Sequence, residues 1–93
     1  MYSIVPSKDF TKALRKLKQS GKFKEAKLQE ALRLLKIGNP LPAQYNDHQL
    51  HGDLGTVREC HVAGDIVLLY KRNDELCIIT LADVGTHHQI FGK

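Results

Sequence analysis

Two continuous apolar runs near the C-terminal end of the chain constrain its fold more than any other feature. They cover residues 66–70 and 76–81, and the turn formers Asn73 and Asp74 lie between them. Runs of this kind are typical of central strands, because both faces of such a strand are covered. The intervening turn predicts that the two strands pair as an antiparallel hairpin.

The rest of the sequence predicts one more strand beside this hairpin and a strand and two helices before it. Residues 57–62 alternate as a strand, and residues 2–6 form a β-prone run that ends at a proline. Two amphipathic helical patterns lie between them, at about residues 8–19 and 22–37. They are joined by a short glycine-containing turn, so we expect them to pack as a hairpin.

The element order is therefore β-α-α-β-β-β, which predicts an α+β domain. In this arrangement the two N-terminal helices pack on one face of a mostly antiparallel sheet. A chain of 93 residues is long enough for one modest core, so we expect a single domain over residues 1–93.

The distribution of charge is lopsided. Residues 1–36 hold ten Lys and Arg against three acids, whereas the remainder holds four against seven. A basic half of this density suits a polyanion such as RNA, but lysine-rich helices are equally often just solvated. No apolar run approaches a membrane span and the first residues carry charge throughout, so we expect a cytoplasmic protein without a signal peptide or membrane contact.

All five histidines follow Asp47, and imidazole is the side chain best suited to moving protons near neutral pH. His48 and His51 lie in a long connection with little periodicity, a kind of loop that is often functional. Strand alternation places Arg58 on one face of its strand and His61 on the other. Asp65 follows the next turn, where it can orient His61.

Other kinds of site have little support in the sequence. No pair of histidines or cysteines has a recognised metal-ligand spacing, and P-loop, GxGxxG and serine-nucleophile motifs are absent, so we expect neither a metal nor a cofactor. Cys60 and Cys77 lie in apolar segments, which predicts two small buried hydrophobic residues and no disulfide.

One family resemblance accounts for several of these features together. The string LPAQYNDHQLHGDLGTVRECHVAGDIVLLYK, followed by GTHHQIFGK, resembles the YafQ branch of the RelE/ParE superfamily of bacterial toxins. The motifs cover about residues 40–93, and the element order and basic helices extend the likeness to the whole chain. The resemblance implies a RelE-like fold and a small toxin of a type II toxin–antitoxin system. Toxins of this branch are ribosome-dependent endoribonucleases.

The resemblance also implies roles for individual residues. The family has a histidine in the loop, which His48 matches, and a basic residue and a histidine in the following strand, which Arg58 and His61 match. Asp65 matches the acid that follows this strand histidine. His87 matches the C-terminal histidine, and Phe91 matches the terminal aromatic residue. A ribose 2′-OH would attack the adjacent phosphate without a metal.

In that reaction His87 is the candidate acid, and His61 or His48 with Asp65 is the base. Arg58 would stabilise the phosphate charge, and Phe91 would stack on a base. His51 and His88 match no family role, so we expect them to be surface residues. The expected RNA contacts are basic residues of the helical half: Lys8, Lys12, Arg15, Lys16, Lys22 and Lys24.

The chain departs from its relatives at two positions. Relatives often carry an arginine just before the Gly-Thr/Ser-His motif, where this chain has Asp83 and Val84, and an acid there opposes the field that a phosphate needs. Ile66 stands where some relatives have tryptophan, which removes a stacking surface.

The expected partners are a cognate antitoxin, in a possible heterotetramer, and the ribosome with its mRNA. Two alternatives remain at this point. One is a ParE-like toxin that inhibits a topoisomerase, although such chains lack the histidine set. The other is an antitoxin-binding module whose nuclease site has decayed, which Asp83 alone favours.

Overall fold

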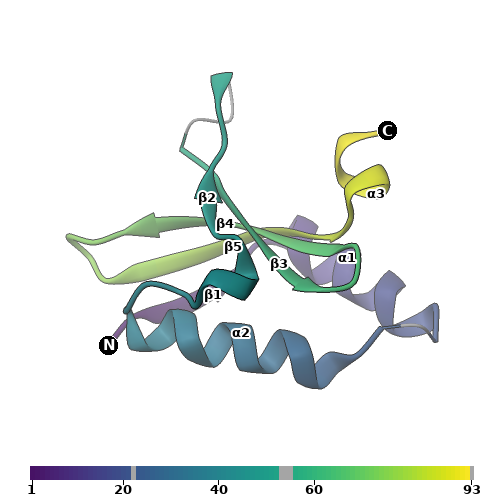
Figure 1. Cartoon of the computed structure of the whole chain (residues 1–93), viewed down its shortest axis with the longest axis horizontal. Coiled ribbons are helices and arrows are strands. Elements are labelled where there is room, and N and C mark those ends of the chain that lie inside the picture. Colours follow the sequence, from purple (N-terminus) through teal and green to yellow (C-terminus); the bar gives the residue numbers. More distant parts are fainter. Residues whose placement is uncertain (22, 53–55, 93) are drawn as a thin grey trace.

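A five-stranded sheet forms the centre of the molecule (Figure 1). The computed structural model describes residues 1–21, 23–52 and 56–92. The order of the strands across the sheet is β1-β5-β4-β3-β2, and every pairing is antiparallel except that of β1 with β5. The strands are β1 (Ser3–Pro6), β2 (His48–Gln49), β3 (Arg58–Ala63), β4 (Ile66–Asn73) and β5 (Ile78–Thr86).

The predicted hairpin of β4 and β5 is confirmed, but its turn is wider than the sequence suggested. β5 begins at Ile78, two residues later than the apolar run. The side chain of Asn73 accepts a hydrogen bond from the backbone of Leu76, which extends the turn, and Leu76 is 66% exposed. Cys77 takes a left-handed backbone (φ 54°) in this turn and is exposed. The prediction that both cysteines are buried is therefore wrong for Cys77 and confirmed for Cys60.

The two predicted helices, α1 (Lys8–Gln19) and α2 (Glu25–Ile37), cover one face of the sheet. Ser7 caps α1 by accepting a hydrogen bond from the backbone N–H of Phe10. The helices pack mainly on different parts of the sheet, α1 against β5 and α2 against β3 and β1, and not mainly against each other, so the expectation that they pack as a hairpin is wrong. None of the helices in residues 1–21, 23–52 and 56–92 has the length and apolar character needed to cross a membrane.

Between the sheet and these helices lies the core, which contains Cys60 and Val62 of β3 and Leu68 and Tyr70 of β4. Strand alternation turns the residues between them to the opposite face. On that face, Glu59 pairs in register with Leu69, and His61 with Val67.

Three short elements that the sequence did not predict complete the molecule. A 3-10 turn, η1 (Ala43–Tyr45), and the two-residue β2 lie within the long connection, and α3 (His87–Phe91) follows β5. Figure 1 shows β2 and α3 rising from the side of the sheet that faces away from α2. They therefore flank the face that carries Glu59 and His61.

Candidate active site

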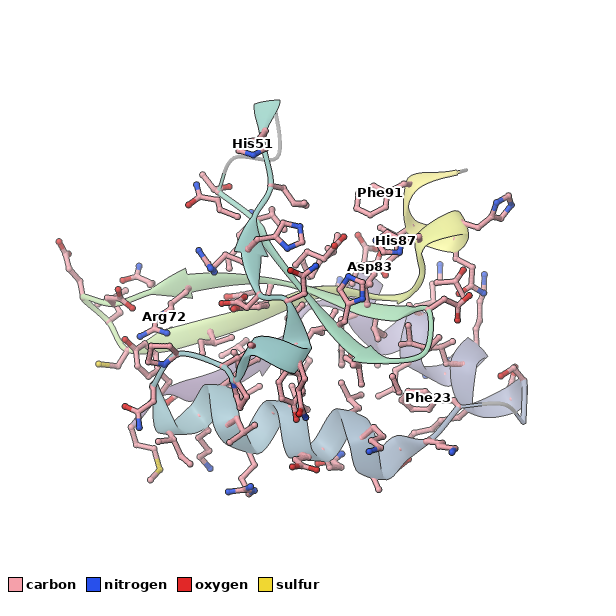
Figure 2. The ribbon with its side chains drawn as sticks, viewed as in Figure 1. Phe23, His51, Arg72, Asp83, His87 and Phe91 are labelled. Atoms are coloured by element: carbon pink, nitrogen blue, oxygen red, sulfur yellow. The ribbon has the colours of Figure 1, made fainter. Side chains whose placement is uncertain are left out.

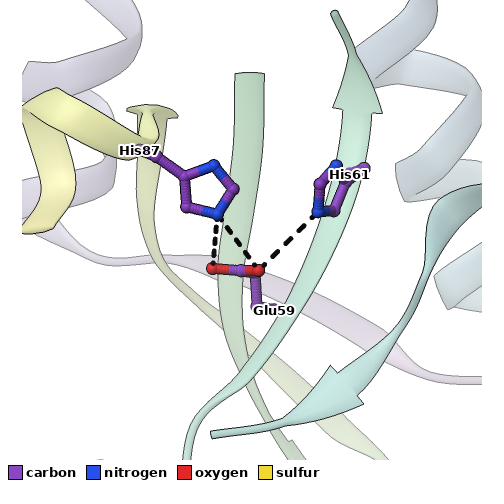
Figure 3. Close-up of side chains that lie close together, drawn as sticks. All are labelled: Glu59, His61 and His87. Carbon is purple, nitrogen blue, oxygen red and sulfur yellow. Dashed lines mark hydrogen bonds and ion pairs between the residues drawn. The ribbon is translucent and has the colours of Figure 1, made fainter. Parts of the chain in front are cut away.

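Three of the five histidines lie around one buried carboxylate. Glu59 of β3 is only 4% exposed, and its Oε1 lies 3.4 Å from Nε2 of His48 and 3.8 Å from Nε2 of His61. Nε2 of His87 lies 3.4 Å from Oε1 and 3.4 Å from Oε2 (Figure 3). All three rings therefore turn the same nitrogen toward one acid.

Strand register explains how residues distant in sequence meet here. His48 of β2 pairs directly with Glu59 of β3, so their side chains share a face. His61 lies two residues further along β3, on that same face. His87 arrives from the other side as the first residue of α3.

The position of His87 is fixed by a capping box at the start of α3. The Thr86 hydroxyl accepts a hydrogen bond from the backbone of Gln89, and the Gln89 side chain accepts one from the backbone of Thr86. Gly85 allows this fold-back, because a Cβ at that position would lie 2.9 Å from Oε1 of Gln89. The last strand and α3 therefore meet at a sharp, well-defined corner.

The hydrogen bonding of His48 identifies which of its nitrogens can exchange a proton. Nδ1 lies 2.7 Å from the backbone carbonyl of Asn46. A carbonyl oxygen can only accept, so Nδ1 carries the proton of this hydrogen bond. Nε2, the atom that faces Glu59, is then left as the proton-exchanging atom.

Aromatic rings extend the cluster along α3. The rings of His61 and His87 lie edge to face with centroids 5.5 Å apart. The rings of His87 and Phe91 are stacked with centroids 5.8 Å apart. Figure 2 shows Phe91 and His87 together on α3, whereas His51 lies apart from them on the projecting connection. His51 and His88 are exposed, as expected for surface residues.

Arg58 and Asp65, two other predicted site residues, are not brought to this cluster. Arg58 lies on the helix-covered face of β3, where its Nη2 is 2.9 Å from Oδ2 of Asp47. Asp65 is exposed in the turn before β4, and within the described part of the chain it makes no hydrogen bond or ion pair. It lines a cavity of about 820 Å³ between the α1–α2 connection and the start of α3. His61 is oriented toward Glu59 instead.

The basic residues expected to contact RNA are exposed where the structure describes them, and Lys22 lies outside the described residues. Lys8, Lys12 and Arg15 line a depression of about 320 Å³ on α1. Lys12 and Lys16 also line a cavity of about 410 Å³ together with Asp83 and residues of α3. The basic side of α1 therefore adjoins the helix that carries His87.

Glu59 is the site residue that sequence reasoning missed. Alternation along β3 places it on the same face as His61, so the pattern contained the signal, but the long-range approach of His48 and His87 could not be read from spacing. Glu59, His61 and His87 also offer three ligand atoms within 4.8 Å of one another. One carboxylate and two imidazoles form a donor set that suits zinc or copper. The sequence, which predicted no metal, gave no indication of this group.

Comparison with known proteins shows which family shares this sequence and fold. Residues 2–92 match the family model described as bacterial toxin of type II toxin–antitoxin system, YafQ. The mRNA interferase toxin YafQ of Escherichia coli K12 is 39% identical over an alignment 93 residues long, which covers 98% of this chain and 92% of the relative.

Two solved structures share the whole fold. The E. coli DinJ–YafQ toxin–antitoxin complex contains a chain that is 33% identical with a TM-score of 0.86, and the match covers 98% of both chains. A metal-bound toxin from Helicobacter pylori is also 33% identical with a TM-score of 0.86, covering 98% of this chain and 100% of that one.

The fold and the sequence matches thus define a bacterial toxin of the RelE kind, as the sequence motifs indicated. The match extends over nearly the whole chain, from residue 2 to residue 92. The protein belongs to the YafQ family of type II toxin–antitoxin systems.

Proposed function

We propose that this protein is an mRNA interferase, which cleaves messenger RNA on the ribosome by histidine acid–base chemistry and is silenced by a cognate antitoxin. The observation that carries the proposal is the convergence of three Nε2 atoms on the carboxylate of Glu59. The activity named for the E. coli relative supports it. Because the substrate is bound to ribosomes, the cytoplasm is the expected compartment.

The reaction is an internal transfer that consumes no water. The 2′-oxygen of a ribose attacks the adjacent phosphorus while the bond from phosphorus to the 5′-oxygen breaks. The products are a 2′,3′-cyclic phosphate and a free 5′-hydroxyl. One proton leaves the 2′-OH and one reaches the 5′-oxygen, so the site needs a base, an acid and a positive charge near the phosphate.

His48 is the base in this proposal and His87 is the acid. The carbonyl of Asn46 holds the Nδ1 proton of His48, so its Nε2 is the atom that takes the proton from the 2′-OH. His87, held by the capping box on the opposite side of Glu59, gives its Nε2 proton to the leaving 5′-oxygen. The sequence alone left either His48 or His61 as the base, and this proposal selects His48.

Glu59 stabilises the positive charge of the site on either of two histidines. Before the reaction the charge lies on His87, and afterwards it lies on His48. Both Nε2 atoms are 3.4 Å from the same carboxylate, so this one acid stabilises the imidazolium in both states. Because Arg58 is turned to the other face, this imidazolium is also the cation nearest to the reacting phosphate in the proposed reaction.

We propose that catalysis needs no metal, because each step has a protein group to perform it. A metal held by Glu59, His61 and His87 would supply Lewis-acid chemistry, but it would also take up Nε2 of His87, the atom assigned as the acid. The metal bound to the H. pylori relative is consistent with a metal-binding capacity in this family. In this protein, such an ion would act as an inhibitor.

Substrate and partner contacts form the remainder of the proposal. The exposed basic residues of α1 would bind ribosomal RNA with an affinity that falls with salt. Phe91, stacked beside His87, would hold an unstacked base. An antitoxin would bind in a heterotetramer of two chains of each kind, and the DinJ–YafQ complex of the relative supports such a partner.

Primer extension on a reporter mRNA in a reconstituted translation mixture tests the activity. Discrete cleavages in frame with codons are expected with the wild type and should fall by about 10²- to 10⁴-fold with His87→Ala. His88→Ala is the matched control, since His88 is the next residue of α3, is exposed, and touches neither Glu59 nor Phe91 through any ring contact or ion pair in the described chain. Intact mRNA and undisturbed translation with wild-type protein would contradict the proposal.

A modified substrate separates the acid from the base. Replacing the leaving 5′-oxygen by sulfur makes a leaving group that needs no protonation. Such an mRNA should restore cleavage by His87→Ala but not by His48→Ala. The opposite pattern of rescue would reverse the two assignments, and equal rescue of both variants would refute them.

A further inference from the structure

The face of β3 opposite to the histidine cluster carries a second polar group, formed by Asp47, Arg58 and Tyr70. Arg58 and Tyr70 are direct partners across β3 and β4, and both reach the carboxylate of Asp47. Nη2 of Arg58 lies 2.9 Å from Oδ2 and its Nε 3.4 Å from Oδ1, while the Tyr70 hydroxyl donates to Oδ1. Each oxygen of Asp47 therefore has a donor.

This group is held more rigidly than a surface ion pair. Tyr70 is 1% exposed, and the side chains of Asp47 and Arg58 are 18% and 31% exposed. Burial, followed by the hydrogen bond to Asp47, raises the pKa of Tyr70 well above its ordinary range. The hydroxyl therefore stays protonated and remains a donor at any physiological pH. The bidentate contact from the Arg58 guanidinium also restricts the orientation of the Asp47 carboxylate.

The position of Asp47 in the chain links this group to the histidine cluster on the other face of the sheet. Asp47 directly precedes His48, and successive side chains on an extended strand point to opposite faces. Asp47 therefore reaches the core side while His48 reaches Glu59. A shift of the Asp47 carboxylate would move the backbone that carries His48.

The strand that carries His48 is short. β2 is only two residues long and pairs with β3 alone, at the edge of the sheet. Asn46, which accepts the Nδ1 proton of His48, has a left-handed backbone with φ of 45° and lies between η1 and Asp47. Asp47 is thus the residue next to His48 whose side chain is hydrogen-bonded on the core side, while Tyr45 of η1 is buried in the core two residues earlier.

We propose that Asp47 is a positioning residue for the cleavage reaction: held by Arg58 and Tyr70 through the sheet, it sets the place of Nε2 of His48 beside Glu59. The inference rests on the proposed role of His48 as the base. It also gives Arg58 a role from the far face of the sheet, without contact with the phosphate.

Two variants test the proposal at different points of the group. Asp47→Asn keeps the shape but removes the charge, and Tyr70→Phe removes one donor while leaving the ion pair. In single-turnover cleavage at saturating toxin, both should slow the reaction, Asp47→Asn by roughly 10- to 100-fold. The toxin concentration at half-maximal rate should stay unchanged, because the substrate-binding surface is intact. Wild-type rates in both folded variants would overturn the proposal.

The chain contains a matched control of the same chemistry. Tyr2, Arg72 and Asp74 form a similar group, in which Nε of Arg72 lies 2.6 Å from Asp74 and the Tyr2 hydroxyl donates to Asp74 at 2.6 Å. Figure 2 shows Arg72 far along the sheet from His87. Asp74→Asn should leave the cleavage rate unchanged, and an equal loss of rate in this variant would contradict a specific role for Asp47.

A double-mutant cycle distinguishes positioning from a general structural role. In a His48→Ala background, Asp47→Asn should cause no further loss of rate, since the residue that it positions is gone. Losses that multiply would overturn the proposal. Nuclear magnetic resonance of the His48 ring gives a readout that does not depend on nuclease activity. Its signals should shift in Asp47→Asn and stay in place in Asp74→Asn, so a failure of the proposed nuclease function and a failure of this inference are distinguishable.

Discussion

Nε2 of His87 lies 3.4 Å from both carboxylate oxygens of Glu59, although the two residues are 28 positions apart in the sequence. One comes from a buried strand and the other from the first position of a five-residue helix. A short helix that is fixed by its cap can hold an imidazole over a strand without covering it. The three imidazoles are accordingly 34% to 46% exposed, whereas the carboxylate between them is buried.

We expect Glu59→Gln to lower the single-turnover cleavage rate by about 10²-fold, a loss typical of removing one preorganised electrostatic contact from a reacting site. The substitution keeps the shape of the side chain but removes the charge that stabilises the imidazolium of His87 and His48. The measurement is primer extension over time, with circular dichroism to verify the fold. Glu75→Gln, in the exposed turn before β5, is the control and should cleave as the wild type does.

Micromolar zinc or copper should inhibit cleavage by occupying Glu59, His61 and His87, whose ligand atoms lie within 4.8 Å of one another. A chelator that binds these metals but leaves ribosomal magnesium in place should restore the rate, and alone it should have no effect. Cys77→Ser, which removes the exposed thiol, should be inhibited equally. Loss of activity with the chelator alone would contradict metal-free catalysis.

The β4–β5 hairpin and the two faces of β3 were the parts of the sheet that the sequence could predict. Continuous apolar runs identified β4 and β5, and alternation along β3 separated Arg58 and Cys60 from His61 correctly. These assignments depend only on local periodicity and on the need to cover two faces of a strand.

The short elements could not be predicted for a physical reason. β2 has two residues and α3 has five, so each is too short for a strand or helix pattern to repeat. Tertiary contacts fix them: register with β3 in one case and the capping box of Thr86 in the other. The meeting of His48 and His87 at Glu59 depends on both elements, so the sequence identified the histidines but not the acid that joins them. The sequence analysis instead predicted that Asp65 orients His61, a role that Glu59 has in the structure.

Asp83→Arg should raise the cleavage rate, by roughly 3- to 10-fold at low salt. Register places His48, Glu59, Leu69 and Asp83 in one row across four strands, so position 83 lies about 10 Å from Glu59. Burial, followed by the charge of Asp9, raises the pKa of Asp83, and the charged form of this carboxylate would oppose a phosphate bound at the cluster. Asp83→Asn should give a smaller gain. A rate that is unchanged in both variants would show that this position does not affect the reacting phosphate.

The two cysteines should react with thiol reagents at very different rates. Burial raises the pKa of Cys60 to about 12, and its side chain is inaccessible, whereas Cys77 is exposed in the turn before β5. One equivalent of iodoacetamide should label Cys77 alone in the folded protein at pH 8. Mass spectrometry of peptides measures this directly, and denaturant should make both thiols reactive. Labelling of Cys60 in the native protein would contradict its buried position.

Asp74→Asn should destabilise the protein at neutral pH but not in strong acid. Hydrogen bonds from Tyr2 and then from Arg72 lower the pKa of Asp74, so the folded state binds the proton of this carboxyl less tightly than the unfolded state does. Its contribution is therefore fully present above the unfolded pKa of about 4 and is lost as the pH falls through the lower folded value. Urea midpoints of wild type and variant should differ at pH 7 and converge as the pH falls from 5 toward 3. A difference that stays constant over this range would mean that the carboxylate charge is not what Tyr2 and Arg72 hold in place.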